Sequence, residues 1–454
     1  MNVGIRPAPV RRPAAALVAA LVVSIVSIGS VAAAGGATRP AASTGSCAEP
    51  SGVVKVGISY FGGVENNLGD IGAEESADLT PATRAILDGY KAGTQALNDH
   101  GGLAGCKVQP VIFNFSAASS DFNQTSQQEC AAFTQDDHVL AVFATAYETR
   151  VAVDCFAKAK TPLFTAGANY PPTCTDYKKY AGYVYSPAGV ATCRFGAFVS
   201  MWNTAGLFPK DAKVGILAMD DGSGQGKKLA ADVWTPALKR LKIPVETFSY
   251  TGATNSATFA DVNAALANAV LKFKADGVNV VVFTPAGAQG VAAFMPQAQA
   301  QGYFPNYGLT SADGLQIAST LGGGAIKKAI AISWTIADLP LSAQEALPAN
   351  DAIASCAEWS TPSTTALTGS TPYCDFLNVL SAGLDGTTKA DAASLRKGIE
   401  ALGTGFVSSM TYEGATKLAR HRYDGATRAM MLEFDPASAS FVPMSDEGSI
   451  VTLP

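Results

Sequence analysis

The sequence contains few of the residues that metal centres and acid–base catalysts use. Only three of the 454 residues are histidines, His100, His138 and His421, and they are widely separated. The eight cysteines form no C-x-x-C pair, so their spacing does not predict a zinc site. The G-x-S-x-G nucleophile elbow and the H-E-x-x-H zinc motif are also missing. We therefore expect a protein that is not an enzyme and that needs no metal or cofactor.

Charged side chains are scarce too, at 15% of the residues, and the basic ones are not in excess. The 32 Lys and Arg face 37 Asp and Glu, which gives a formal net charge of −5. A protein that follows a phosphate backbone needs clustered Lys and Arg, so we expect no nucleic-acid partner. Hydrophobic residues reach 48%, which excludes a disordered chain and allows a large buried core.

Beyond residue 34 the sequence has no run that is long and apolar enough to cross a bilayer. Residues 1–34 combine three arginines, an apolar stretch over 14–28 and an Ala-x-Ala pattern at 32–34, which is typical of a secretory signal peptide. A permanent membrane anchor is the alternative, but the stretch is short and no stop-transfer charges follow it. We predict a secreted or extracytoplasmic protein in which residues 35–52 form a flexible N-terminal segment.

All eight cysteines lie beyond the predicted signal peptide, and an even number in an exported chain indicates disulfide bonds. They are Cys47, Cys106, Cys130, Cys155, Cys174, Cys193, Cys356 and Cys374. Lipid attachment at Cys47 is a rival interpretation. It is disfavoured because Thr44 stands where a lipobox has Leu, and because lipidation leaves an odd number of cysteines.

From residue 53 onward, apolar β-type runs alternate with segments of helical periodicity. The first series predicts strands at 53–58, 108–115, 139–143 and 162–165, and helices at 80–99, 121–135 and 147–159. The second predicts strands at 214–219, 245–250, 278–283 and 307–310, and helices at 190–205, 225–241, 258–275 and 288–301. Nearly continuous apolar strands between helices indicate parallel sheets covered on both faces, so we predict two doubly wound α/β lobes.

The pattern loosens after residue 315. Residues 329–334 are strand-like, 391–402 are helical, and the chain ends with β-rich runs at 408–410, 429–434 and 441–442. The segment 340–375 is rich in Thr, Ser and Pro, and no element is assigned to it.

Several motifs occur in an order and spacing that resemble a known family. These are the strand at 53–58, the helix ending Leu97-Asn98-Asp99, Gly101-Gly102-Leu103-Ala104-Gly105, the strand at 108–113, and the segment from Pro162 to Asn169. Together they resemble the branched-chain amino acid (Leu/Ile/Val)-binding proteins, which are type I periplasmic solute-binding components of ABC importers. The likeness runs over most of residues 53–445.

The resemblance implies two doubly wound parallel-sheet lobes joined by three crossover segments. It places lobe 1 at 53–186 plus 334–408 and lobe 2 at 187–333 plus 409–454. It also implies that the ligand lies in the cleft at the carboxyl ends of the strands, and that an ABC permease recognises the closed form. In a sheet of order 2-1-3-4-5, the same fold implies the disulfide pairs Cys47–Cys106, Cys130–Cys155, Cys174–Cys193 and Cys356–Cys374.

The loops that follow the strands supply the expected ligand-binding residues. In lobe 1 they are Tyr60, Phe61, Thr145, Ala146, Tyr147, Gly167, Ala168, Asn169 and Tyr170, and in lobe 2 Asp221, Ser223, Pro285, Ala286 and Asp313. In the family the two later lobe-1 loops hold the carboxylate of an amino acid, and Asp313 falls where an acid pairs with the ligand's ammonium. Any one of these residues could instead serve only as a helix cap or a loop turn.

The carboxylate side departs from the family pattern. Thr145-Ala146-Tyr147-Glu148 replaces a Ser-rich loop, and the family's Gly-Ala-Thr becomes Gly167-Ala168-Asn169. The tyrosines at 60, 147 and 170 and Phe61 could form an aromatic wall. The expected ligand is therefore an amino acid, an amide, or an aromatic or alicyclic acid, and not specifically leucine.

The run from Gly222 to Lys228 resembles a nucleotide-binding loop but lacks the required spacing.

The family resemblance predicts a solute-binding protein that delivers a small organic molecule to an ABC permease. Two alternatives stay open at this point. One is a ligand sensor of the same fold, whose closed form a receptor recognises. The other is an exported hydrolase.

Overall fold

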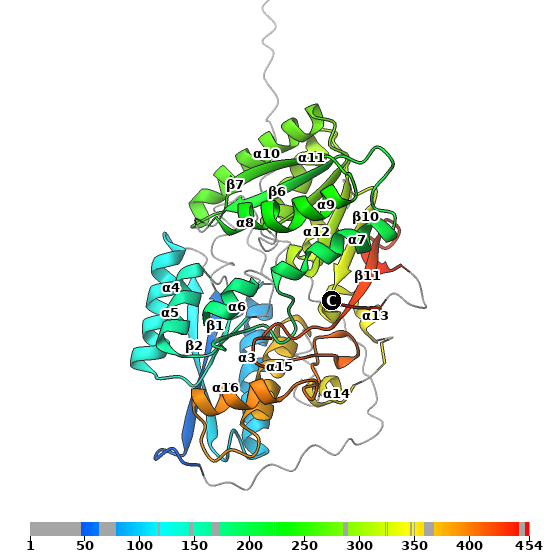
Figure 1. The fold of residues 1–454 in the computed structure, drawn as a ribbon. Helices are drawn as coiled ribbons and strands as arrows, with labels where there is room; N and C mark the ends of the chain where they lie inside the picture. The colour runs from blue at the N-terminus through cyan, green and yellow to red at the C-terminus, as the bar shows by residue number, and fades with distance from the viewer. Residues whose placement is uncertain are drawn as a thin grey trace, which may run out of the picture.

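The computed structural model describes residues 47–62, 79–116, 119–144, 149–165, 173–180, 182–220, 222, 224–284, 289–322, 324, 326–345, 347–348, 350–357, 367–444 and 450–453. These residues form two α/β lobes, one above the other in Figure 1. None of the helices in these ranges has the length and apolarity of a membrane span.

Lobe 1 is built on a five-stranded parallel sheet of order β2-β1-β3-β4-β5. Its strands are β1 (Val53–Gly62), β2 (Lys107–Ser116), β3 (Val142–Ala144), β4 (Leu163–Thr165) and β5 (Val184–Tyr185). The helices α3 (Leu79–Asp99), α4 (Phe122–Ala131), α5 (Arg150–Ala159) and α6 (Cys174–Tyr180) alternate with these strands along the chain. This order confirms the 2-1-3-4-5 arrangement that the family resemblance implied.

Lobe 2 contains an eight-stranded mixed sheet of order β12-β11-β10-β9-β8-β6-β7, with β13 paired to β11. The strands are β6 (Val214–Asp220), β7 (Val245–Thr251), β8 (Val280–Phe283), β9 (Asn306–Thr310), β10 (Ala329–Ser333), β11 (Arg428–Asp435), β12 (Ser440–Pro443) and β13 (Ile450–Thr452). The strands from β6 to β10 pair in parallel and the last three pair antiparallel. Two separate hydrophobic clusters of buried residues pack on this sheet.

The helices of lobe 2 are α7 (Gly196–Thr204), α8 (Gln225–Leu229), α9 (Thr235–Arg240), α10 (Phe259–Ala275), α11 (Gln289–Ala300) and α12 (Leu315–Gly322). The single helix expected at 225–241 is two α-helices joined by a π-helical turn at Ala230–Trp234. That turn buries Trp234, which stacks on Trp202 of α7 with ring centroids 5.2 Å apart. Burial of the large indole therefore coincides with the departure from regular α geometry.

Polar side chains fix where several helices begin. The Asp121 carboxylate accepts hydrogen bonds from the backbone N–H groups of Asn123 and Gln124, and so caps α4. The Thr149 hydroxyl accepts from Ala152 N at the start of α5. These caps satisfy backbone donors that have no partner inside the helix, which explains why α4 and α5 begin where they do.

No element was predicted for residues 340–375, but the structure is helical over much of this segment. The segment contains α13 (Leu341–Glu345), α14 (Asp351–Ala357) and the start of α15 (Leu367–Leu384), and α16 (Ala392–Ala401) follows. Figure 1 shows α15 beside α3, and the Thr94 hydroxyl lies 2.7 Å from the Tyr373 hydroxyl between these two helices. Pro372 inside α15 lowers the helix propensity of the segment, so tertiary packing and not local preference makes it helical.

The strand-like run at 408–410 is not a strand, a second difference from expectation. Its Ser408 hydroxyl, Ser409 N and Ser409 hydroxyl all donate to the buried Asp375 carboxylate of α15, at 2.7–3.2 Å. These donors are satisfied by a carboxylate instead of by a neighbouring strand.

Crossing segments join the two lobes. The hydrophobic core of lobe 1 contains residues from the first part of the chain, up to Ala191, and again from Tyr373 to Tyr423. One of the two hydrophobic cores of lobe 2 contains Ile336, Leu339 and Tyr412. Ser186 N donates to Tyr423 O, and Ile336 N donates to Met410 O, each at 2.8–2.9 Å. The crossing segments are thus hydrogen-bonded to one another. The expected residue boundaries of the lobes stay a prediction.

The four disulfide pairs are confirmed. Cys47–Cys106, Cys130–Cys155, Cys174–Cys193 and Cys356–Cys374 have Cα atoms 4.6, 6.3, 5.8 and 5.7 Å apart. The cysteines of three pairs, Cys47–Cys106, Cys130–Cys155 and Cys356–Cys374, pack in or against the hydrophobic core of lobe 1. The fourth pair, Cys174–Cys193, links α6 to the segment just before α7 of lobe 2.

Candidate functional site

The carboxyl ends of the parallel strands of the two lobes face each other. The segment after β2 meets the segment after β7, because Phe122 N donates to Thr254 O at 3.0 Å and Asn255 Nδ2 donates to Ser120 O at 2.9 Å. The helix after β6 meets the helix after β4, because Gln225 Nε2 donates to Asp176 Oδ2 at 3.2 Å. Ligands of open α/β sheets bind outside the carboxyl ends of the strands, so this interface is the candidate site.

On the lobe-1 side, the end of β1 presents Tyr60, which is half-buried, and the buried Ser59 beside it. Behind them lies Glu129 of α4, which is also buried. Burial raises the pKa of Glu129 to about 7, although a hydrogen bond with the Ser59 side chain opposes the shift. Phe61 is a residue of β1, and its side chain lies outside the described part.

On the lobe-2 side, Asp313 lies just after β9 and is buried, at 1% exposure. Its Oδ2 atom accepts hydrogen bonds from Thr310 N and the Thr310 hydroxyl, at 2.7 and 2.8 Å, in a capping box. Its Oδ1 atom is buried and has no hydrogen-bond partner among the described residues. Burial, together with the nearby Asp338 carboxyl, raises the pKa of Asp313 to about 7. Asp313 therefore serves as a cap and leaves its second carboxylate oxygen buried without a hydrogen bond.

A second acid, Asp338, lies next to this wall on a crossing segment. The hydroxyls of Ser311 and Ser333 donate to its Oδ2 atom, at 2.5 and 2.8 Å. The Ser333 hydroxyl also lies 2.8 Å from the Tyr412 hydroxyl of another crossing segment. Burial raises the pKa of Asp338 to about 6. The network links the ends of β9 and β10 to the connections between lobes.

Most of the expected site residues fall outside the described ranges. They are Thr145, Ala146, Tyr147, Gly167, Ala168, Asn169, Tyr170, Asp221, Ser223, Pro285 and Ala286. Tyr60 and Asp313 lie at strand ends as expected, on opposite lobes. The ligand-binding role of every residue in the set stays a prediction.

Sequence reasoning missed three groups at this interface: Asp338, Gln225 and Asn255. Gln225 and Asn255 do follow predicted strands, and that position is a usable signal. Asp338 has no such signal, because it lies in a crossing segment whose course depends on the whole fold.

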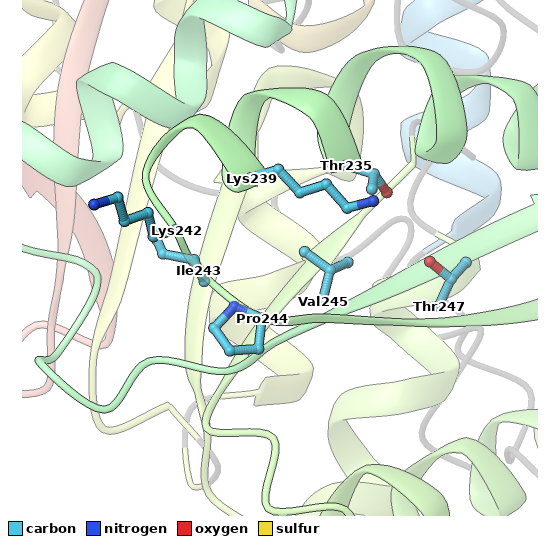
Figure 2. Close-up of a pocket in the computed structure, with 7 residues that line it drawn as sticks. All are labelled: Thr235, Lys239, Lys242, Ile243, Pro244, Val245 and Thr247. Carbon is cyan, nitrogen blue, oxygen red and sulfur yellow. The ribbon is translucent and has the colours of Figure 1, made fainter.

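Two hollows occur among the described residues. One, of about 30 Å³, is lined by Phe143, Phe164, Thr165, Pro187, Ala188, Pro372, Asp375, Phe376 and Met410, and has room for about one water. The other, of about 350 Å³, is an outer groove of lobe 2. Figure 2 shows that its lining side chains come from α9, the turn after it and β7. It lies toward the amino end of β7, away from the facing sheet ends.

No cluster of His, Cys, Asp and Glu that could hold a metal ion occurs in the described part of the chain.

Neither a family model nor a curated protein sequence matches this chain.

Solved structures do match, over most of the chain. A branched-chain amino acid ABC transporter structure from Thermus thermophilus with bound valine aligns with a TM-score of 0.58 at 14% identity, over 87% of this chain and 95% of that one. This decides the fold. The chain has the type I periplasmic-binding-protein fold.

Two further structures with this fold have other ligand chemistry. A solute-binding protein of an ABC transporter from Rhodopseudomonas palustris, in complex with 3,4-dihydroxybenzoic acid, aligns with a TM-score of 0.58 at 14% identity, over 88% of this chain and 98% of that one. A fatty acid ABC transporter substrate-binding protein from Thermomonospora curvata aligns with a TM-score of 0.57 at 12% identity, over 89% and 95%. The type I fold thus accommodates ligands of quite different polarity.

Proposed function

We propose that this protein is an extracytoplasmic solute-binding protein that captures a small organic ligand between its two lobes and delivers it to an ABC transporter. The observation that carries the proposal is the opposition of the two sheets, whose carboxyl ends meet through residues such as Gln225 and Asp176. The ends of parallel strands are where this class of sheet binds ligands.

The chemistry of the two walls supports a ligand with a polar head. Lobe 2 offers the unpaired Oδ1 atom of Asp313, which suits a donor such as an ammonium or amide group. Lobe 1 offers the ring of Tyr60, which suits an aromatic or alicyclic body. The ligand class is therefore an amino acid, an amide, or an aromatic or alicyclic acid.

The disulfides support a location outside the cytoplasm. All eight cysteines are paired, and such bonds persist in oxidising compartments. The basic and apolar first 34 residues fit export, as a signal peptide would. The solved structures with the same fold come from ABC transport systems, which favours a membrane permease as the partner.

A thermal-shift screen of the protein against amino acids, amides, aromatic acids and alicyclic acids tests the proposal. A ligand present at 100 times its dissociation constant adds about 2.7 kcal/mol to the free energy of unfolding. A variant of the outer groove, Lys239→Ala, serves as the control and should show the same shift. Absence of any shift across all four classes, or turnover of a bound compound, would contradict the proposal. Loss of uptake of the identified ligand on deletion of the gene would support transport over sensing.

A further inference from the structure

The strand β7 lies at one edge of the lobe-2 sheet, because β6 is the only described strand with which it pairs. At the start of this ladder Val214 N donates to Pro244 O. At its end Gly252 N donates to Asp220 O. In a parallel pair only every second residue of a strand bonds to its partner strand. The backbone groups of the odd-numbered residues from 245 to 251 therefore point outward from the sheet.

The other edges of the two sheets carry features that discourage pairing with a further strand. The edge strand β2 of lobe 1 contains Pro110, and β12 ends at Pro443. The strands β5 and β13 are only 2 and 3 residues long. Prolines and short length are usual protections of a sheet edge. β7 has 7 residues with neither proline nor lysine, and it exposes the side chains of Thr247, Ser249 and Thr251. It is thus the one long unprotected edge among the described strands.

The outer groove of about 350 Å³ runs beside this edge, between β7 and α9. Val245 and Thr247 of β7 line it, together with Lys239 and Lys242 from α9 and the turn after it. In Figure 2 the two lysine side chains point toward opposite ends of the groove. The groove therefore borders both the outward backbone of β7 and two ammonium groups.

The positive charge of the groove is not compensated by the described residues. No acidic side chain lines the groove, and neither Lys239 nor Lys242 forms an ion pair with a described residue. Glu246, the one charged residue of β7, lies on the opposite face because side chains alternate along a strand. There Lys213 and Lys272 lie 3.5 and 3.6 Å from its carboxylate. The groove thus has two positive charges available for a partner.

We propose that the edge of β7 and the outer groove bind an extended acidic segment of a partner protein. The segment adds to the sheet as a further strand, and its backbone bonds to the outward groups of β7. Its alternate side chains enter the groove beside Val245 and Thr247, where carboxylates meet Lys239 and Lys242. Backbone bonds supply the affinity, and the lysines select an acidic sequence. This docking surface is separate from the candidate solute site and goes beyond the proposed function.

The same charge disfavours a second copy of this chain as the occupant. Two copies paired edge to edge along β7 would bring two basic grooves side by side, and like charges across an interface cost free energy. Lysines beside an edge strand commonly prevent such self-association. An acidic segment turns the repulsion into attraction, so charge complementarity selects the occupant.

Titration of the whole protein with a synthetic peptide that alternates glutamate and valine tests the proposal. The peptide has the length of β7, 7 residues. A peptide with lysine in place of every glutamate is its control. We expect saturable binding of the acidic peptide alone, weakening as added salt screens the charges. Failure of the acidic peptide to bind at low salt would overturn the proposal.

Charge reversal in the groove tests the role of the lysines. Lys239→Glu with Lys242→Glu should weaken binding of the acidic peptide by roughly tenfold or more, because carboxylates then face carboxylates. Lys158→Glu with Lys397→Glu makes the same change in net charge at exposed lysines of α5 and α16 in lobe 1. This matched control should keep the affinity within about twofold, since distant exposed charges are screened. Equal losses in the two double variants would assign binding to net charge and exclude the groove.

A proline at the edge tests the backbone contribution. The amide of Thr247 points outward, so Thr247→Pro removes a donor for the added strand and leaves the ladder to β6 intact. Thr247→Val keeps this amide with a side chain of similar size. We expect the proline variant to lose roughly tenfold or more in affinity and the valine variant to bind like the wild type. Wild-type affinity in a folded proline variant would exclude strand addition.

Hydrogen exchange along β7, followed by NMR, gives a direct signature in the unmodified protein. The acidic peptide should slow exchange of the odd-numbered amides of β7 by roughly tenfold or more, and leave the amides bonded to β6 unchanged. Absence of this protection would place the peptide elsewhere and overturn the proposal. Protection of the same amides without peptide, in a protein whose size grows with concentration, would instead identify a second copy as the occupant. The peptide measurements use no solute, so failure of the ligand screen and failure of this docking surface are separate results.

Discussion

Arg194 Nη1 lies 2.6 Å from Asp424 Oδ2, and this ion pair joins the first crossing segment to the last. Both side chains are largely buried, at 13% and 9% exposure. Asp424 Oδ2 also accepts from Ala191 N at 3.0 Å. Nearby, burial and then the Arg194 charge lower the pKa of Arg422, while Asp424 opposes that shift. Asp424 thus balances two arginines where the lobes are connected.

Asp424→Asn removes that balancing charge but keeps an acceptor for Ala191 N. Breaking one partner of a buried pair leaves an uncompensated charge, so we expect a loss of about 3 kcal/mol in the free energy of unfolding, measured with denaturant. The exposed pair Lys91 and Asp88 is the control, and Asp88→Asn should change stability by less than about 0.5 kcal/mol. Equal effects of the two substitutions would show that the buried pair has no special role.

Asp313 can be tested with two substitutions that separate its roles. Asp313→Ala removes both the charge and the cap, and Asp313→Asn removes the charge while keeping an acceptor for Thr310 N. A hydrogen bond to a charged group is worth about 1.5–3 kcal/mol, so both should weaken an amino-acid ligand by roughly tenfold or more in calorimetric titration. Unchanged affinity in both variants removes Asp313 from the ligand site.

The raised pKa of Asp313 also gives a pH dependence. An ammonium group is attracted to the ionised carboxylate, and the pKa of about 7 means that this form grows as pH rises through neutrality. Affinity for an amino-acid ligand should therefore increase between pH 6 and pH 8. Asp313→Asn should abolish the increase, and a persistent increase in that variant would assign it to another group.

Stability should depend on pH through the buried Asp375. Burial raises its pKa from 3.8 to about 6 in the folded state. A raised pKa means that the carboxyl contributes stability that is fully present below about pH 4 and is lost as pH rises through about 6. The stability of the wild type relative to Asp375→Asn should fall by about 3 kcal/mol between pH 4 and pH 7. Denaturant unfolding at several pH values measures this, and a constant difference would contradict it.

The disulfide between Cys130 and Cys155 should stabilise lobe 1. It joins consecutive helices and closes a stretch with a sequence separation of 25 residues. A loop of this size predicts a stabilisation of about 3 kcal/mol, mainly by restricting the unfolded chain. Replacing both cysteines by serine should therefore lower the denaturation midpoint without changing ligand affinity. A loss below about 1 kcal/mol would mean that the native structure gains little from this bond.

Much of the fold could be predicted because its strands are locally distinctive. The runs at β1, β6 and β8 are apolar and β-branched, and they are buried as expected. The helix α15 could not be predicted, because Pro372 and its polar neighbours hide a helix that packing on α3 stabilises. In the candidate site, the position of Asp313 after a strand could be predicted from the sequence. The hydrogen bonds between Asp313 and Thr310 in the capping box could not.

The sequence by itself determined the alternation of strands and helices and a cysteine set consistent with four disulfides, and it predicts an export signal, since each depends on residues near one another or on composition. Only the tertiary structure decided that Asn255 meets Ser120 and that Gln225 meets Asp176. Those partners are separated by 135 and 49 residues. Periodicity reports which face of an element is buried, whereas the element that covers it depends on how both lobes and their crossing segments pack together.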